Sequence, residues 1–207
     1  QAEDGIRGAQ ESRGLGDVYK RQILNYFISI WPSALGGIYI RQYTWSRFLR
    51  SCGKQVIFGQ QIVVKGFSSI NVGSNGSFMS GSFFYSEDEG QITVGDNCAF
   101  NHNVMLGASG GGKISIGNNV LIGPNVVIRA CDHNFDDINK PIYLQGHSRG
   151  AIMIDDDVWI ASNVVITKDV HIGKGVIIGA GSVVSHDLPE MTVCSGNPAI
   201  PIRSRLV

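Results

Sequence analysis

Residues 116–134, IGNNVLIGPNVVIRACDHN, decide the fold of this chain. Isoleucine recurs at every sixth position from Ile116 to Ile128, and a valine follows each of the first two isoleucines by four residues. An amphipathic helix has a period of 3.6 residues and a half-buried strand a period of two, so a period of six favours a coil of short straight runs separated by turns. The repeat stops at Asp132 and His133, where we expect chemistry.

The six-residue spacing returns in four groups of three apolar residues. They are Val94, Phe100 and Leu106; Ile116, Ile122 and Ile128; Ile154, Ile160 and Ile166; and Ile172, Ile178 and Val184. Three such repeats close one triangular coil of about 18 residues, and stacked coils share backbone hydrogen bonds at ~4.8 Å. We therefore predict an all-β fold, a parallel β-helix whose periodic side chains point inward. Upstream, the repeat is ragged at Phe58, Val64 and Ile70, and we expect residues 73–90 to interrupt it.

A second series of small residues lies four positions after the periodic ones. Its members are Cys98, Val104, Val120, Val126, Val158, Val164, Val170, Val176 and Ser182. We expect them to point into the prism where space is tight, which makes Cys98 a small core residue rather than a nucleophile. Glycine and asparagine near the expected corners tolerate the backbone angles that tight turns require.

Composition narrows the classes of function. The chain has 207 residues, enough for one substantial body, and its 17 basic and 17 acidic residues balance to a formal net charge of zero. A long-range field that would gather nucleic acid is therefore absent, and we expect no nucleic-acid partner. The four cysteines are far apart and form no CxxC pair, which favours reduced thiols in a cytoplasm over a disulfide framework.

The first 55 residues precede the regular repeat. Residues 1–22 are polar, lack an apolar period and resemble translated adapter-derived sequence, so we interpret them as a non-native leader. Residues 23–55 form the predicted helical N-terminal segment, with one short helix in residues 23–35 and another in residues 38–50 that ends at Ser51–Gly53. The first is too short to span a bilayer. We expect it to pack on the body, and peripheral membrane contact through residues 23–50 is the alternative, which would place the protein at the inner face of the membrane.

Several segments of the repeat carry a family resemblance. IGNNVLIGPNVVI, the Asp-His that follows it, DDVWIASNVVI, VIIGAGSVV and the closing SGNPAIPIRS resemble hexapeptide-repeat acyltransferases with a left-handed β-helix, in the branch of galactoside and maltose acetyltransferases and enzymes that acetylate cell-surface polysaccharides. The resemblance covers residues 58–203. It implies left-handed coils, a β-helix catalytic domain over residues 56–188, a C-terminal tail over 189–207, acetyl-coenzyme A as cosubstrate with no metal required, and a homotrimer with active sites between neighbouring prisms.

His133 is the candidate general base. It follows the coil IGPNVVI and opens a segment of about 20 residues, 131–151, that leaves the repeat, and long loops in a compact repeat are usually functional or disordered. Imidazole titrates near neutral pH, as proton removal from a hydroxyl during acyl transfer requires. The residue also matches the family's catalytic histidine. Asp132, Asp136 or a backbone carbonyl is expected to orient the ring, and His147, His171 and His186 are interpreted as exposed histidines without a role.

The resemblance also implies binding residues. Asn101, with His102 beside it, corresponds to a position that contacts the acceptor across the subunit interface. The pantetheine arm of coenzyme A is expected along Ser162 and Ala180, then Ser185, with Arg203 at the nucleotide phosphates. Trp159 is too large for a narrow prism, so we predict that it forms an outer wall of the groove. His186 and Ile200 depart from the family pattern, where Lys and Arg are common, which puts the nucleotide contacts in doubt.

Three hypotheses of function follow. The first is an O-acetyltransferase that transfers acetyl from acetyl-coenzyme A to a sugar hydroxyl. The second is a zinc enzyme of the carbonic-anhydrase type, which needs closely spaced histidines, and no HxxxxH pair occurs. The third is a non-catalytic structural or binding β-helix. The Gly-rich turn at residues 107–113 lacks the GxxxxGK[ST] pattern, so we interpret it as a corner bulge rather than a phosphate loop.

Overall fold

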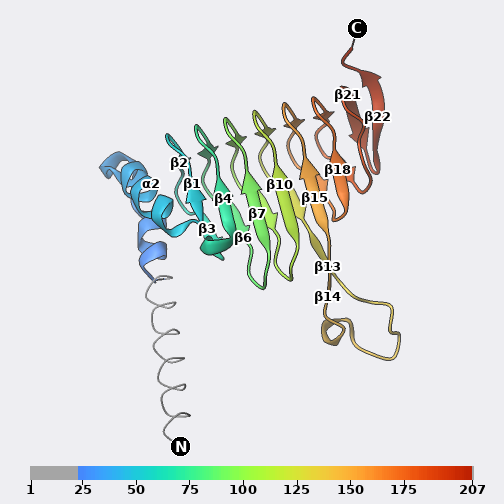
Figure 1. Cartoon of the computed structure of the whole chain (residues 1–207), viewed down its shortest axis with the longest axis horizontal. Helices are drawn as coiled ribbons and strands as arrows, with labels where there is room; N and C mark the ends of the chain where they lie inside the picture. Colours follow the sequence, from blue (N-terminus) through green and yellow to red (C-terminus); the bar gives the residue numbers. More distant parts are fainter. Residues whose placement is uncertain (1–22, 207) are drawn as a thin grey trace, which may run out of the picture.

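The computed structural model describes residues 23–206, and the predicted leader, residues 1–22, lies outside this range. The chain forms a long three-sided prism of stacked coils, with helices at one end and a β-hairpin at the other (Figure 1). The predicted all-β, parallel β-helix is confirmed.

Each side of the prism is a sheet, and we name the sides faces A, B and C. Face A contains β1 (Ser51–Cys52), β4 (Ile70–Val72), β7 (Gln91–Val94), β10 (Lys113–Ile116), β15 (Ala151–Ile154) and β18 (Val170–Ile172). Face B contains β2 (Ile57–Phe58), β5 (Ser77–Phe78), β8 (Ala99–Phe100), β11 (Leu121–Ile122), β16 (Trp159–Ile160), β19 (Ile177–Ile178), β21 (Thr192–Gly196) and β22 (Ala199–Ser204). Face C contains β3 (Val63–Lys65), β6 (Phe83–Tyr85), β9 (Met105–Gly107), β12 (Val127–Arg129), β17 (Val165–Ile166) and β20 (Val183–Val184). One coil adds one strand to each face, which gives six coils.

Both predicted inward series form the core. All twelve periodic residues from Val94 to Val184 are at most 3% exposed, and so are the nine small residues of the second series, from Cys98 to Ser182. Coils stack in register, as Phe100, Ile122 and Ile160 show. The corners use positive φ angles, and asparagine side chains there bond from coil to coil, for example Asn103 to Asn125 at 3.1 Å. Local sequence and long-range stacking therefore favour the same backbone.

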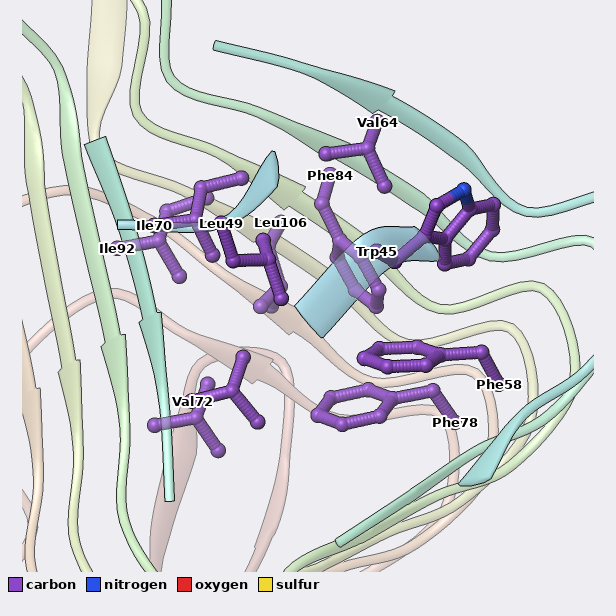
Figure 2. A pocket seen from close by; sticks show the side chains of 11 residues that line it. Trp45, Leu49, Phe58, Val64, Ile70, Val72, Phe78, Phe84, Ile92 and Leu106 are labelled. Carbon is purple, nitrogen blue, oxygen red and sulfur yellow. The ribbon is translucent and has the colours of Figure 1, made fainter. Parts of the chain in front are cut away.

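The expected interruption at residues 73–90 is wrong, because the coil continues through it. Phe78 and Phe84 are buried at inward positions where aliphatics were expected. The ring of Phe78 stacks between Phe58, at 5.4 Å, and Phe100, at 4.7 Å. Figure 2 shows the first of these stacks beside Trp45, around an apolar gap of about 10 Å³. This gap lies inside the core and is too small for a substrate.

The N-terminal helices close the first coil. Residues 23–30 are helical, a 3-10 turn follows at Ser33–Leu35, and α2 runs over Gly37–Phe48. The second helix thus ends before its expected stop, and Ser51–Cys52 is strand β1. Both helices pack on the body, since Ile28 and Trp45 belong to the core.

Arg41 is the polar centre of this helical cap. Its side chain is fully buried, whereas Tyr39 is exposed. The residue of α2 that faces the prism is therefore Arg41 and not Tyr39. The guanidinium donates to the carbonyls of Phe58 (2.8 Å) and Trp31 (2.6 Å) and to the hydroxyl of Ser33 (2.8 Å). These neutral acceptors satisfy a charge that burial would otherwise penalise. Arg41 therefore joins both helical segments to the first coil.

The other end of the prism is covered by a hairpin within the predicted tail, residues 189–207. Strand β21 continues face B beside β19, and β22 pairs with β21 in the antiparallel sense. Before the hairpin, Leu188 is buried and bridges to Ile172. The last coil is thereby shielded from solvent.

Candidate active site

Four predicted binding residues lie on one edge of the prism. Asn101, His102, Ser162 and Ala180 occupy the corner between faces B and C, which we call the B/C edge and which comprises residues 101–103, 123–125, 161–163 and 179–181. Backbone bonds join its coils, such as Asn125 N to His102 O (2.9 Å) and Gly181 N to Ser162 O (2.9 Å). At ~4.8 Å per coil, Asn101 and Ala180 are roughly 14 Å apart along the edge. A straight, exposed edge of this length suits an extended arm such as pantetheine.

Beside this edge, face B carries an open groove of about 440 Å³. It is lined by Ser77, Met79, Ala99, Phe100, Asn101, His102, Leu121, Ile122, Gly123 and Trp159. The Trp159 side chain points outward and is 50% exposed, as predicted. The groove thus places a predicted acceptor contact, Asn101, and a predicted donor contact, Trp159, on one surface.

A hydrogen bond within the corner turn orients the side chain of Asn101. Its Oδ1 accepts a hydrogen bond from the backbone N–H of His102 at 2.8 Å. Within the described residues, Nδ2 has no hydrogen-bond partner and remains available as a donor. An amide fixed in this way can position a sugar hydroxyl.

The two remaining residues predicted to contact coenzyme A, Arg203 and Ser185, lie apart from each other. Arg203 is exposed on β22, opposite Val193, where face B ends. Ser185 follows β20 at the corner between faces C and A, which we call the C/A corner, so it is not on the B/C edge. The structure therefore groups five of the predicted binding residues with Arg203 at the end of their face, and leaves Ser185 on another edge.

His133 stands on a projecting hairpin at the C/A corner. Strand β13 (Cys131–His133) pairs with β14 (His147–Arg149) in the antiparallel sense, so the chain leaves the prism and returns to it (Figure 1). Cys131 is buried at the base, and His133 is exposed. The hairpin places the imidazole on an exposed strand residue, where an acceptor can reach it, as a general base requires.

The partner of the His133 ring is another histidine. His147 is directly opposite in register, and the two ring centroids are 4.2 Å apart with a 39° angle between the planes. No hydrogen bond joins His133 to Asp132 or Asp136 within the described residues. Sequence reasoning assigned His147 no role, because 14 residues separate it from His133 and only strand pairing brings them together. His171 instead bonds Asp155 at 3.0 Å on face A, and His186 is exposed.

The Gly-rich turn supports the hairpin. A Cβ on Gly110 would lie 3.7 Å from Cβ of His147, and one on Gly111 would lie 3.3 Å from Cδ of Arg149. Both glycines have positive φ angles. Arg149 also forms an exposed ion pair with Glu89 at 3.9 Å. The turn is thus a corner bulge, as predicted, and its glycines let β14 approach closely.

One side chain organises the tip of the loop beyond the hairpin. Gln145 donates to the carbonyls of Asp137 and Lys140, each at 2.8 Å, and its Oε1 accepts from the Asp137 N–H at 3.0 Å. Five large apolar side chains are exposed around it: Phe135, Ile138, Ile142, Tyr143 and Leu144. The loop therefore presents an ordered apolar surface next to His133.

His133 and the B/C edge are on opposite margins of face C. The stretch from Asn125 to Ala130 crosses that face through β12, which corresponds to roughly 15 Å of extended chain. Reacting groups must approach to about 3–3.5 Å. Within one protomer, the candidate base and the candidate binding edge therefore lie too far apart to act on the same atoms.

Neither a buried cysteine nor a metal cluster adds to this site. Burial raises the pKa of the Cys98 thiol, which keeps it protonated and agrees with its place in the core. Among residues 23–206, no group of three or more His, Cys, Asp or Glu side chains could hold a metal ion.

Comparisons with known proteins agree with the fold. Residues 151–186 match the family described as Bacterial transferase hexapeptide (six repeats). A 2,3,4,5-tetrahydropyridine-2,6-dicarboxylate N-acetyltransferase of Staphylococcus aureus is 45% identical over 56 residues, 27% of this chain and 23% of the relative. The chain thus spans about a quarter of the length of the curated relatives it matches.

Solved structures extend the similarity over most of the chain. A hexapeptide-repeat acetyltransferase from Vibrio cholerae, complexed with acetyl-coenzyme A, is 25% identical with a TM-score of 0.64, covering 91% of this chain and 87% of that one. A Bacillus cereus N-acyltransferase in complex with dTDP-4-amino-4,6-dideoxyglucose and coenzyme A has the same fold, with 20% identity, a TM-score of 0.67 and coverage of 80% and 88%. The match over residues 151–186 and the six stacked coils make this chain similar in repeat and fold to hexapeptide-repeat acetyltransferases.

Proposed function

We propose that this protein is an acetyl-coenzyme-A-dependent O-acetyltransferase that acetylates a sugar hydroxyl, on a cell-surface polysaccharide or its precursor. The observation that carries the proposal is the exposed imidazole of His133, held at the C/A corner by a paired hairpin in a fold shared with an acetyl-coenzyme-A-bound acetyltransferase. Free cysteines at all four positions fit a reducing cytoplasm, where we place the reaction.

In the proposed mechanism, His133 acts as the general base. Its neutral ring nitrogen takes the proton of the acceptor hydroxyl as the oxygen attacks the thioester carbonyl carbon. The tetrahedral intermediate collapses, the C–S bond breaks, and the thiolate takes the proton from the imidazolium to leave as free coenzyme A. Asn101 positions the acceptor, while Trp159, Ser162 and Ala180 hold the arm of the donor. No acyl-enzyme forms.

A complete site requires a second copy of the chain. His133 and the B/C edge are separated by face C, so we propose that a neighbouring prism brings its B/C edge to the hairpin. The apolar loop tip, with Ile138 at 94% exposure, is a surface that such a neighbour would cover. A ring of three copies, each giving its hairpin to the next, forms three equivalent sites. The proposed active unit is therefore a homotrimer.

Transfer to an amine is the second candidate function. The Staphylococcus aureus relative, at 45% identity over 56 residues, bears the name of an N-acetyltransferase. That match covers a quarter of the chain, and nothing in the groove on face B distinguishes a hydroxyl acceptor from an amine. Hydroxyl and amine acceptors therefore belong in the same assay.

The direct test measures thiol release from acetyl-coenzyme A. The native protein and the His133→Ala variant are incubated with matched pairs of sugars and amino sugars, and the products are identified by mass. We expect ester products, and a general base contributes about 10²–10⁴-fold, so His133→Ala should lose that factor. Amide products alone would select the second candidate. Equal turnover by both proteins would overturn the role of His133.

A further inference from the structure

The helical end of the prism carries a concentrated apolar surface. Ten large hydrophobic side chains between residues 23 and 43 are exposed: Ile23, Leu24, Tyr26, Phe27, Ile30, Trp31, Leu35, Tyr39, Ile40 and Tyr43. Many large apolar side chains exposed within so short a stretch of chain indicate an interaction site. Five of the ten are aromatic, and aromatic side chains with polar tips are typical of membrane interfaces.

Charge is distributed unevenly along the prism, and this identifies the partner. Residues 23–86 contain five lysines or arginines and no aspartate or glutamate. Residues 87–207 contain eight basic and thirteen acidic residues. The net charge of zero therefore hides a cationic helical end and an anionic remainder. An anionic surface would attract the first and repel the second, which orients the molecule with its helices toward that surface.

The cations of this end are available for binding. Arg41 is buried on neutral oxygens, but Arg47, Arg50, Lys54 and Lys65 are exposed on α2 and the first coil. The guanidinium of Arg47 lies 3.6 Å from the ring centroid of exposed Tyr43. This pair places a cation on an aromatic ring at the protein surface, where the ring can enter the headgroup layer while the cation meets lipid phosphate.

We propose that the helical end binds the surface of an anionic phospholipid membrane. We name it the membrane face: the ten exposed apolar residues between 23 and 43, with Arg47, Arg50, Lys54 and Lys65. No helix in residues 23–206 is long and apolar enough to span a bilayer. In the proposed binding mode the helices lie in the interface. A face with cations and no carboxylates gains no ion pairs from a second copy of itself. This proposal is independent of the proposed reaction, because binding requires no turnover.

The test is flotation of the full chain with vesicles of phosphatidylcholine alone or mixed with phosphatidylglycerol. We expect binding to the mixed vesicles only, and its loss at high salt. Arg47→Gln with Arg50→Gln should weaken binding about tenfold or more, since each basic residue near an anionic surface contributes about a factor of five. Phe27→Ser with Tyr39→Ser should abolish it.

The matched control instead removes two exposed apolar residues at the other end of the prism, Ile202→Ser with Leu206→Ser, and should bind as the native protein does. Circular dichroism and urea unfolding verify that each variant is folded. Equal binding to both vesicle types would overturn the assignment to anionic lipid. Absence of binding would also overturn it. If Tyr39→Ser lowered the mass of the assembly, a second copy of the chain would cover this face instead of a membrane.

Discussion

Two inactive variants should restore each other's activity if the site lies between subunits. One variant, His133→Ala, lacks the proposed base and keeps an intact B/C edge. The other, Asn101→Ala with Trp159→Ala, lacks the edge and keeps the base. Face C separates the two groups by roughly 15 Å within a protomer, so neither variant can repair its own site.

The size of the restored activity follows from the geometry of a ring. Each site takes His133 from one subunit and the edge from the next. Any trimer that contains both variants has only one junction at which an intact base faces an intact edge. Mixed trimers should therefore show about a third of the native activity, while each parent stays about 100-fold or more below it. A dimer of the same design would give about half.

The assay uses co-expression of the two variants with different affinity tags. Sequential purification on both tags retains only mixed assemblies, and their mass gives the number of subunits. Thiol release per subunit is then compared with native protein and with a control in which both tags carry His133→Ala. If doubly purified assemblies are no more active than the parents, the base and the edge do not meet across an interface, and the argument from face C is refuted.

Three further predictions concern the scaffold. Arg41→Leu leaves the Phe58 carbonyl without its side-chain donor and the Trp31 carbonyl with only the 3.3 Å bond from Gln60, so it should lower the free energy of unfolding by about 2–4 kcal/mol, measured in urea; an unchanged midpoint would contradict this. Gly111→Ala, at φ +81° and beside Arg149, and Gly36→Ala, at φ +79° in open space, should each lose about 1–2 kcal/mol of stability to the left-handed backbone, and only Gly111→Ala should also reduce turnover; equal turnover in the two variants would contradict this. Burial raises the pKa of the Cys98 thiol above its ordinary 9.0, so the folded chain keeps a proton that the unfolded chain releases. That stability is present below pH 9.0 and is lost as pH rises through the folded pKa, so Cys98→Ala should narrow the stability difference between pH 7 and pH 10; an equal loss in both proteins would contradict it.

The prism could be predicted because its signal is local and repeated. Each coil places a branched side chain inward at the same point, so the period survives from Val94 to Val184 in spite of a long insertion. Residues 73–90 also place side chains inward, Phe78 and Phe84, although the sequence analysis predicted an interruption there. Aromatic side chains fill the core of the early coils, and two extra residues between Phe84 and Ile92 shift the repeat.

The sequence predicted candidate residues of the site but not the contacts of His133. His133 and the corner residues Asn101, Ser162 and Ala180 were selected by family resemblance, and the structure places the corner residues on one edge. The contact between the tilted rings of His147 and His133 could not be predicted, because the sequence shows neither the register of a hairpin nor the approach of a glycine turn. The inward orientation of Arg41 on α2 also depends on tertiary structure, since its guanidinium bonds carbonyls from other segments.

By itself, IGNNVLIGPNVVIRACDHN determined the coil and the point where the coil is broken. Period six, small inward residues and corner asparagines are properties of neighbouring residues, so they appear in the sequence. Only the tertiary structure decided that His133 pairs with His147, that face C separates it from the B/C edge, and that cations and aromatics gather at one end. These relations depend on strand register and on the stacking of successive coils, which join residues far apart in the chain.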